Sequence, residues 1–129
     1  MPGSVQVSLL LLLLTACQHP TPSAAVGRSL YAANGCGSCH GESGEGDGPA
    51  ASRLAVKPAD FRRPDLFRNG ASERAIATML GEGILDKPVS DPHFKHMHHE
   101  LVMPKFDHLT EFERRSIALY VISLSKNSN

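Results

Sequence analysis

The chain has 129 residues, and its 13 Lys and Arg residues balance 13 Asp and Glu residues, so its formal net charge is zero. This balance indicates neither a nucleic acid nor a strongly charged surface as the partner. The length suits one domain with a modest core, which only five Phe, two Tyr and no Trp are available to fill.

The N-terminus has the pattern of an export signal. Val5 to Ala16 is uncharged, apolar and only 12 residues long, whereas a membrane-spanning helix takes about 20. Such a stretch is typical of a signal-peptide core, although here no Lys or Arg precedes it. Leu14-Thr15-Ala16-Cys17 resembles a bacterial lipoprotein signal-peptidase II site. The alternative is an ordinary secretory peptide with a cysteine nearby.

We therefore expect residues 1–16 to be a signal peptide and Cys17 to carry a lipid. The lipid would anchor the exported protein to a membrane, on the periplasmic side. Residues 17–26 are predicted to be a flexible tether, because Gln18 to Val26 contains prolines and small residues but no charged side chain. Fully extended, such a tether reaches about 30 Å. Residues 27–129 are predicted to form the folded domain.

Gly27 to Asn34 is a candidate short helix that leads into the sequence Cys-Gly-Ser-Cys-His at residues 36–40. This C-x-x-C-H pattern is typical of covalent attachment of a c-type haem. Cys36 and Cys39 can each add to one vinyl group of the same haem, and His40 can ligate its iron. The alternative is a redox-active or structural C-x-x-C with a chance histidine. Haem attachment outside the cytoplasm agrees with the export signal.

The remaining elements follow from local patterns. Residues 41–49 are glycine-rich and are predicted to be a loop, without a phosphate-binding pattern. Residues 57–69 are expected to be irregular because two prolines interrupt them. Residues 72–80 are predicted to form a helix that begins at Ser72 as N-cap and is stopped by Gly81 and Gly83.

The last helix is the clearest prediction. Thr110 and Glu113 form a T-x-x-E capping box. The apolar residues that follow at helical spacing are Ile117, Tyr120, Val121 and Leu124. Because no convincing strand is found, the fold class is predicted to be all-α, with three to four helices wrapped around one covalent haem.

Residues 84–105 are predicted to be mostly loop, and they contain a histidine cluster. Its members are His93, His96, His98 and His99. Three roles stay open: a loop that faces solvent or a partner, which we favour, an additional transition-metal site, or the source of an axial haem ligand. The spacing matches no familiar zinc pattern.

A haem iron held by His40 needs a sixth ligand or keeps an open site. Met103 is favoured, because Pro104 stiffens the loop that leads into the last helix. A thioether ligand favours ferrous iron and raises the reduction potential. Met79 fits core packing instead. The other rivals are Met97, His98 and His99.

With these residues, the sequence resembles the class I c-type cytochromes, small bacterial mono-haem electron carriers, over roughly residues 27–125. The resemblance rests on the haem motif, on Met103-Pro104-x-Phe106, and on positions where the first and last helices of that family cross. These positions are Gly27, Tyr31, Ile117 and Tyr120. The resemblance implies that Pro49 offers its carbonyl to the second ring nitrogen of His40, with Pro58 as a rival.

One departure concerns the haem propionates, which the family often holds with Trp and Tyr side chains. This chain has no Trp, and Arg53 is a candidate substitute because guanidinium groups pair well with carboxylates. The other candidates are Arg62, Arg63 and Arg68. A solvated basic face is the alternative for each arginine.

The resemblance implies a membrane-tethered electron carrier rather than an enzyme, with redox proteins as partners and no nucleic acid. One alternative is the haem subunit of a larger respiratory oxidoreductase. Another is a haem sensor or ligand-binding protein with a displaceable sixth ligand. A haem-free thiol-disulfide module is disfavoured because the chain lacks a βαβ pattern.

Overall fold

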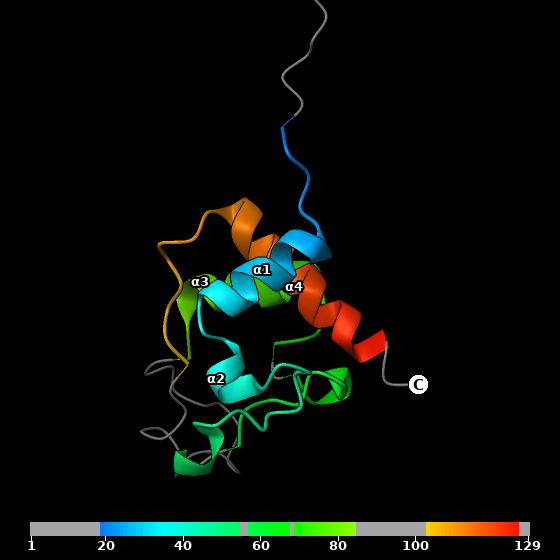
Figure 1. The fold of residues 1–129 in the computed structure, drawn as a ribbon. Coiled ribbons are helices and arrows are strands. Elements are labelled where there is room, and N and C mark those ends of the chain that lie inside the picture. The colour runs from blue at the N-terminus through cyan, green and yellow to red at the C-terminus, as the bar shows by residue number, and fades with distance from the viewer. Residues whose placement is uncertain (1–18, 55–56, 68, 85–102, 127–129) are drawn as a thin grey trace, which may run out of the picture.

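The computed structural model describes residues 19–54, 57–67, 69–84 and 103–126, which form a helical domain (Figure 1). The α-helices in this part of the chain are α1 (Ala24–Ala33), α2 (Gly37–His40), α3 (Glu73–Glu82) and α4 (Glu111–Lys126). Two short 3-10 helices, η2 (Ala51–Arg53) and η3 (Pro64–Leu66), lie between α2 and α3. The described residues contain no strand, so the all-α prediction is confirmed.

Helix α1 begins earlier than the sequence predicted. Ser23 is its N-cap, and the Ser23 side chain accepts a 3.2 Å hydrogen bond from Val26 N. The backbone N–H of Ser23 donates to Ser116 Oγ at 3.3 Å. Residues 23–26, which were expected to belong to the tether, therefore form the cap and first turn of α1. A serine cap satisfies an N–H group that the first turn would otherwise leave without a partner.

Helices α1 and α4 cross at Gly27, as the family resemblance implied. A Cβ atom at this position would overlap the carbonyl oxygen of Ser116 and would lie 2.9 Å from Tyr120 Cβ. Only glycine permits such a close approach. Next to the crossing, the rings of Tyr31 and Tyr120 meet edge to face with centroids 5.2 Å apart. Ile117 is 1% exposed there.

Helices α3 and α4 both carry the predicted caps. Ser72 Oγ accepts from Ala75 N at 3.2 Å at the start of α3. Helix α3 continues through Gly81 to Glu82, and its C-cap is Gly83, whose φ of +67° suits a residue without a side chain. At the start of α4, Thr110 N donates to Glu113 Oε2 at 2.8 Å, and Glu113 N donates to Thr110 Oγ1 at 3.3 Å.

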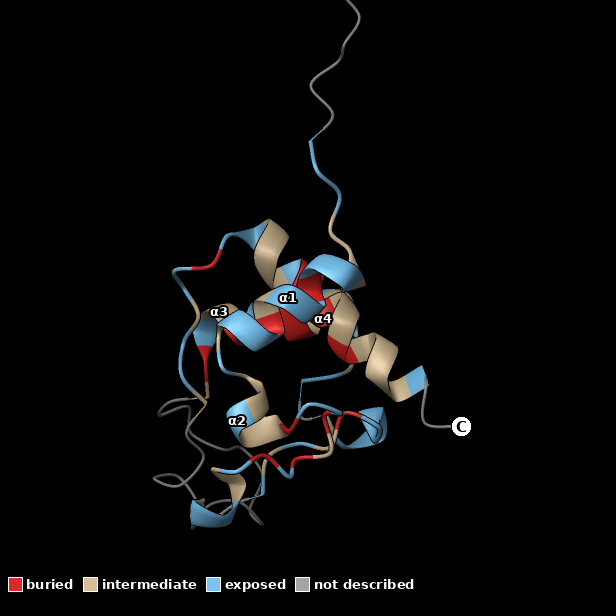
Figure 2. Cartoon of the chain, in the orientation of Figure 1, coloured by how far each residue is buried: buried red, intermediate tan, exposed pale blue. Residues whose placement is uncertain are grey.

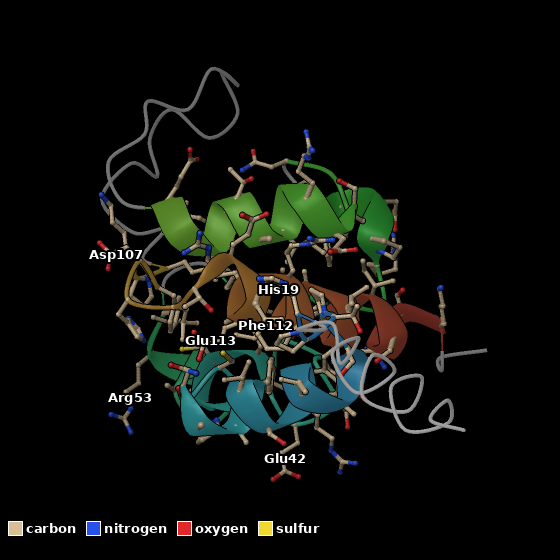
Figure 3. The ribbon with its side chains drawn as sticks, turned by 90° about the horizontal axis from the view of Figure 1, so that it is seen from above. His19, Glu42, Arg53, Asp107, Phe112 and Glu113 are labelled. Atoms are coloured by element: carbon tan, nitrogen blue, oxygen red, sulfur yellow. The ribbon has the colours of Figure 1, made fainter. Side chains whose placement is uncertain are left out.

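The core lies where the three longer helices meet (Figure 2). Figure 3 shows α4 between α1 on one side and α3 on the other. The buried apolar side chains come from these helices and from the loops that flank them: Tyr31, Phe61, Ile76, Ala77, Leu80, Leu109, Ile117, Ala118 and Val121. Helix α2 lies below this layer in the view of Figure 1. The layer is joined to the C-x-x-C-H segment through Cys36, which packs against the core.

Candidate haem-attachment site

The C-x-x-C-H motif forms the single helical turn α2. Cys36 is its N-cap, and Cys36 O accepts from His40 N at 3.0 Å. Residues three and four positions apart lie on the same face of a helix. The side chains of Cys36, Cys39 and His40 therefore lie toward the same face of this helical turn. The sequence predicted the motif but not the helical turn, which is too short to leave a periodic pattern.

Both cysteines of the motif are free thiols and are partly buried. Cys36 packs against the hydrophobic core. Burial raises the pKa of the Cys36 thiol to about 11. Redox-active C-x-x-C motifs have the opposite property, because they stabilise the thiolate and lower its pKa. The environment of Cys36 therefore disfavours the thiol-disulfide alternative.

His40 is held by a backbone carbonyl in the protonation state that suits a metal ligand. Its Nδ1 atom lies 3.1 Å from Ala59 O. A carbonyl oxygen only accepts hydrogen bonds, so Nδ1 carries the proton and the lone pair of Nε2 is free. Burial lowers the pKa of His40, although the hydrogen bond to Ala59 opposes this effect. Burial therefore favours the neutral imidazole, which is the form that ligates a metal.

The acceptor at Ala59 corrects the prediction for Pro49. Pro49 is exposed, and the residues beside it bond to the backbone of α2 instead. Gly48 N donates to Cys39 O at 3.1 Å, and Ala50 N donates to Ser38 O at 2.8 Å. The carbonyl that contacts His40 belongs to Ala59, in the segment that follows η2. Pro58, the rival that we considered, directly precedes the observed acceptor.

The loop after the haem motif is held by tyrosine hydroxyls that sequence reasoning did not assign to it. Tyr31 OH donates a buried 2.7 Å hydrogen bond to Gly41 O. Tyr120 OH donates to Glu42 O at 3.4 Å. His40 O accepts from Gly46 N at 2.9 Å. Both tyrosines were predicted to lie at the helix crossing, and their hydroxyls also connect that crossing to the backbone beside His40.

Met103 lies at a defined position next to the end of α3. Its carbonyl oxygen accepts from Ile84 N at 3.0 Å, and Phe106 N donates to Leu80 O at 2.8 Å. The Met103 side chain is partly buried and packs against the same hydrophobic core as Cys36. Met79, also partly buried, belongs to α3. The other proposed ligands, Met97, His98 and His99, lie outside the described residues, as do His93 and His96.

The arginines proposed to hold propionates differ in their surroundings. Arg62 pairs with Asp60 at 2.7 Å and with Glu45 at 3.3 Å, and it lowers the pKa of Asp60 to about 2. Arg63 pairs with Asp65 at 2.8 Å. Arg53, at the end of η2, is exposed and points away from the body of the domain (Figure 3). Arg68 lies outside the described residues.

The donor set fits a covalently attached haem. One turn carries two free thiols and an imidazole with an available Nε2, and both Cys36 and Met103 adjoin an apolar core. Within the described ranges, no group of three or more His, Cys, Asp and Glu side chains is placed to hold a metal ion by itself. The histidine cluster considered for an additional transition metal falls outside these ranges.

Comparison with known proteins agrees with the site. The family model for cytochrome c matches residues 24–125. A similar solved structure is the reducing HAO-like protein complex Kustc0457/Kustc0458 of Kuenenia stuttgartiensis, with a TM-score of 0.61 and 28% sequence identity. The match covers 78% of this chain and 43% of that chain, so the matched region spans less than half the length of the structural relative. No curated protein matches the sequence.

Proposed function

The chain belongs to the cytochrome c family, and we propose that it carries electrons through one haem attached to Cys36 and Cys39, with His40 as an axial ligand. The observation that carries this proposal is the single helical turn with two free thiols and an imidazole whose Nε2 is available. When bound, the haem supplies an iron that cycles between the ferrous and ferric states.

The residues around the motif would keep the ligand in place during that cycle. Ala59 O holds the proton on Nδ1 of His40, which strengthens the imidazole as a ligand. Tyr31 fixes the carbonyl of Gly41 directly after His40. We propose Met103 as the sixth ligand and Arg53 as a partner for a propionate. The additional metal site at His93, His96, His98 and His99 stays a prediction, which metal analysis of the purified protein tests.

The proposed location is the periplasmic side of a membrane, to which a lipid on Cys17 would anchor the domain. Residues 1–16 would be removed as a signal peptide, and the short segment up to Ser23 would serve as the tether. No helix in the described part of the chain is both long and apolar enough to cross a bilayer. Intact-mass analysis tests the anchor, because Cys17→Ser should abolish lipidation while haem binding persists.

A second candidate function is that of a haem subunit in a larger oxidoreductase. The relative from Kuenenia stuttgartiensis supports it, because that structure is a protein complex and its matching chain is more than twice as long as the matched region. Purification after mild detergent extraction separates the two candidates. A stable stoichiometric partner would support the subunit, and a haem protein that elutes alone would support the free carrier.

The decisive experiment is an absorption spectrum of the purified protein in its oxidised and reduced states, with a haem assay after denaturation. We expect one haem per chain that stays attached to the denatured polypeptide. Replacing both cysteines (Cys36→Ala with Cys39→Ala) should abolish this attachment. A wild-type protein that folds and carries no covalent haem would refute the proposal.

A further inference from the structure

The phenyl ring of Phe61 is stacked on the imidazole of His40, with ring centroids 4.5 Å apart and ring planes inclined by only 21°. From this arrangement we propose that Phe61 is a positioning residue that fixes the plane of the His40 imidazole and therefore the orientation of the axial ligand. The inference rests on the proposed function, since it requires His40 to ligate the haem iron.

The hydrogen bond of His40 is not sufficient to fix this plane. The contact of Nδ1 with Ala59 O, at 3.1 Å, determines where one ring atom points. The imidazole can still turn over a limited range about χ2, because the energy profile of this torsion is broad and a hydrogen bond tolerates a range of angles. A stacked neighbour restricts this turning, since rotation would drive an edge of the imidazole into the phenyl face. The carbonyl and the phenyl ring together therefore define the orientation.

Phe61 is rigid enough to serve this purpose. The residue is 8% exposed, and its N–H donates a 2.7 Å hydrogen bond to Gly44 O. Tyr31 and Phe67 meet its ring edge to face, with centroids 6.4 and 5.8 Å away. Gly44 also lies against the ring, because a Cβ atom there would come within 2.7 Å of Phe61 Cδ2. Close packing on several sides leaves the phenyl ring little freedom to reorient.

The orientation of an axial imidazole has a specific electronic effect. Overlap between the π orbitals of the imidazole and the d orbitals of the iron depends on the direction of the ring plane. In a ferric low-spin haem protein, this direction influences the principal g values and the spread of the haem methyl resonances. These quantities report on ligand orientation and do not depend on electron-transfer activity.

The test compares Phe61→Leu with the matched control Phe67→Leu, each in the haem-loaded protein. Both variants remove one phenyl ring from the same part of the core, but Phe67 meets Phe61 edge-on whereas Phe61 is stacked on His40. We expect Phe61→Leu to change the g values and the haem methyl spread several-fold more than Phe67→Leu. Equal changes in the two variants, or none, would overturn the inference.

A second measurement applies if Phe61→Leu does not fold. In the reduced wild-type protein, which is diamagnetic when low-spin, nuclear Overhauser contacts should connect the ring protons of His40 and Phe61. Their absence would overturn the inference. A wild-type protein without a histidine-ligated haem would instead refute the proposed function. The two failures are therefore distinguishable.

Discussion

The hydroxyl of Tyr31 in α1 donates a 2.7 Å hydrogen bond to the carbonyl of Gly41, the residue that directly follows His40. Tyr31 is 4% exposed, so this bond is shielded from water. The contact joins the first helix, and through Tyr120 the last helix, to the backbone of the haem motif. The stability of the helix crossing and the geometry of the motif are therefore coupled through one side chain.

Removing this hydroxyl should destabilise the protein. Tyr31→Phe leaves the Gly41 carbonyl without its buried donor, which typically costs about 1–3 kcal/mol. Urea unfolding of the haem-loaded protein measures the loss. Tyr120→Phe is the matched control, because its longer 3.4 Å bond to Glu42 O is exposed and should contribute little. A larger loss for Tyr120→Phe than for Tyr31→Phe would contradict the prediction.

The raised pKa of Tyr31 predicts that the free energy of unfolding declines at alkaline pH. Burial raises the pKa of Tyr31 above its usual value, which is about 10 in an unfolded chain. The resulting stabilisation is fully present below about pH 10 and is lost as the pH rises toward the pKa of the folded state. We therefore expect the free energy of unfolding of Tyr31→Phe to fall less steeply above about pH 10 than that of the wild type. Identical slopes would show that Tyr31 is not the group responsible.

Gly27 should tolerate no side chain. In Gly27→Ala, the new Cβ would overlap Ser116 O, which belongs to the backbone of α4 and cannot turn aside. The helices must then separate, and we expect a loss of about 3 kcal/mol, at the upper end for overpacked cores. Thermal or urea unfolding measures it. The control is Ser29→Ala, an exposed position of the same helix, where alanine should be neutral or slightly stabilising.

Met103 should control the red-region charge-transfer band of the ferric protein if its sulfur ligates the iron. Met103→Ala should then abolish the band and lower the reduction potential, because a thioether stabilises ferrous iron. Met79→Leu, a change within α3, should leave both properties nearly unaltered. The opposite result is equally clear: a wild type without the band, whose potential responds to replacement of His98 and His99, would identify a histidine ligand.

Features determined by nearby residues were predictable from the sequence. Ser72 and Thr110 begin helices because their hydroxyls reach N–H groups within the same turn. The Gly27 crossing depends on residues far apart in the sequence, so it was expected only from the family resemblance. The start of α1 was missed because proline and small residues around Ser23 resemble a linker more than a helix cap.

The contacts of His40 that the sequence did not predict depend on how an irregular segment folds back onto the helical turn. The acceptor for His40 was assigned to Pro49, yet the folded loop brings Ala59, 19 residues from His40, to the imidazole. The stacking of Phe61 depends on the same path. No local pattern specifies which of several carbonyls or rings in an irregular segment will reach a given side chain.

The hydrogen bond between Ile84 N and Met103 O has a consequence for changes of chain length at this place in the fold. The bond holds these two positions side by side, although 18 residues separate them in the sequence. The entropy of closing a loop grows only slowly with its length. A change in the number of residues between the two positions should therefore cost little stability as long as Met103 keeps its contact with the end of α3.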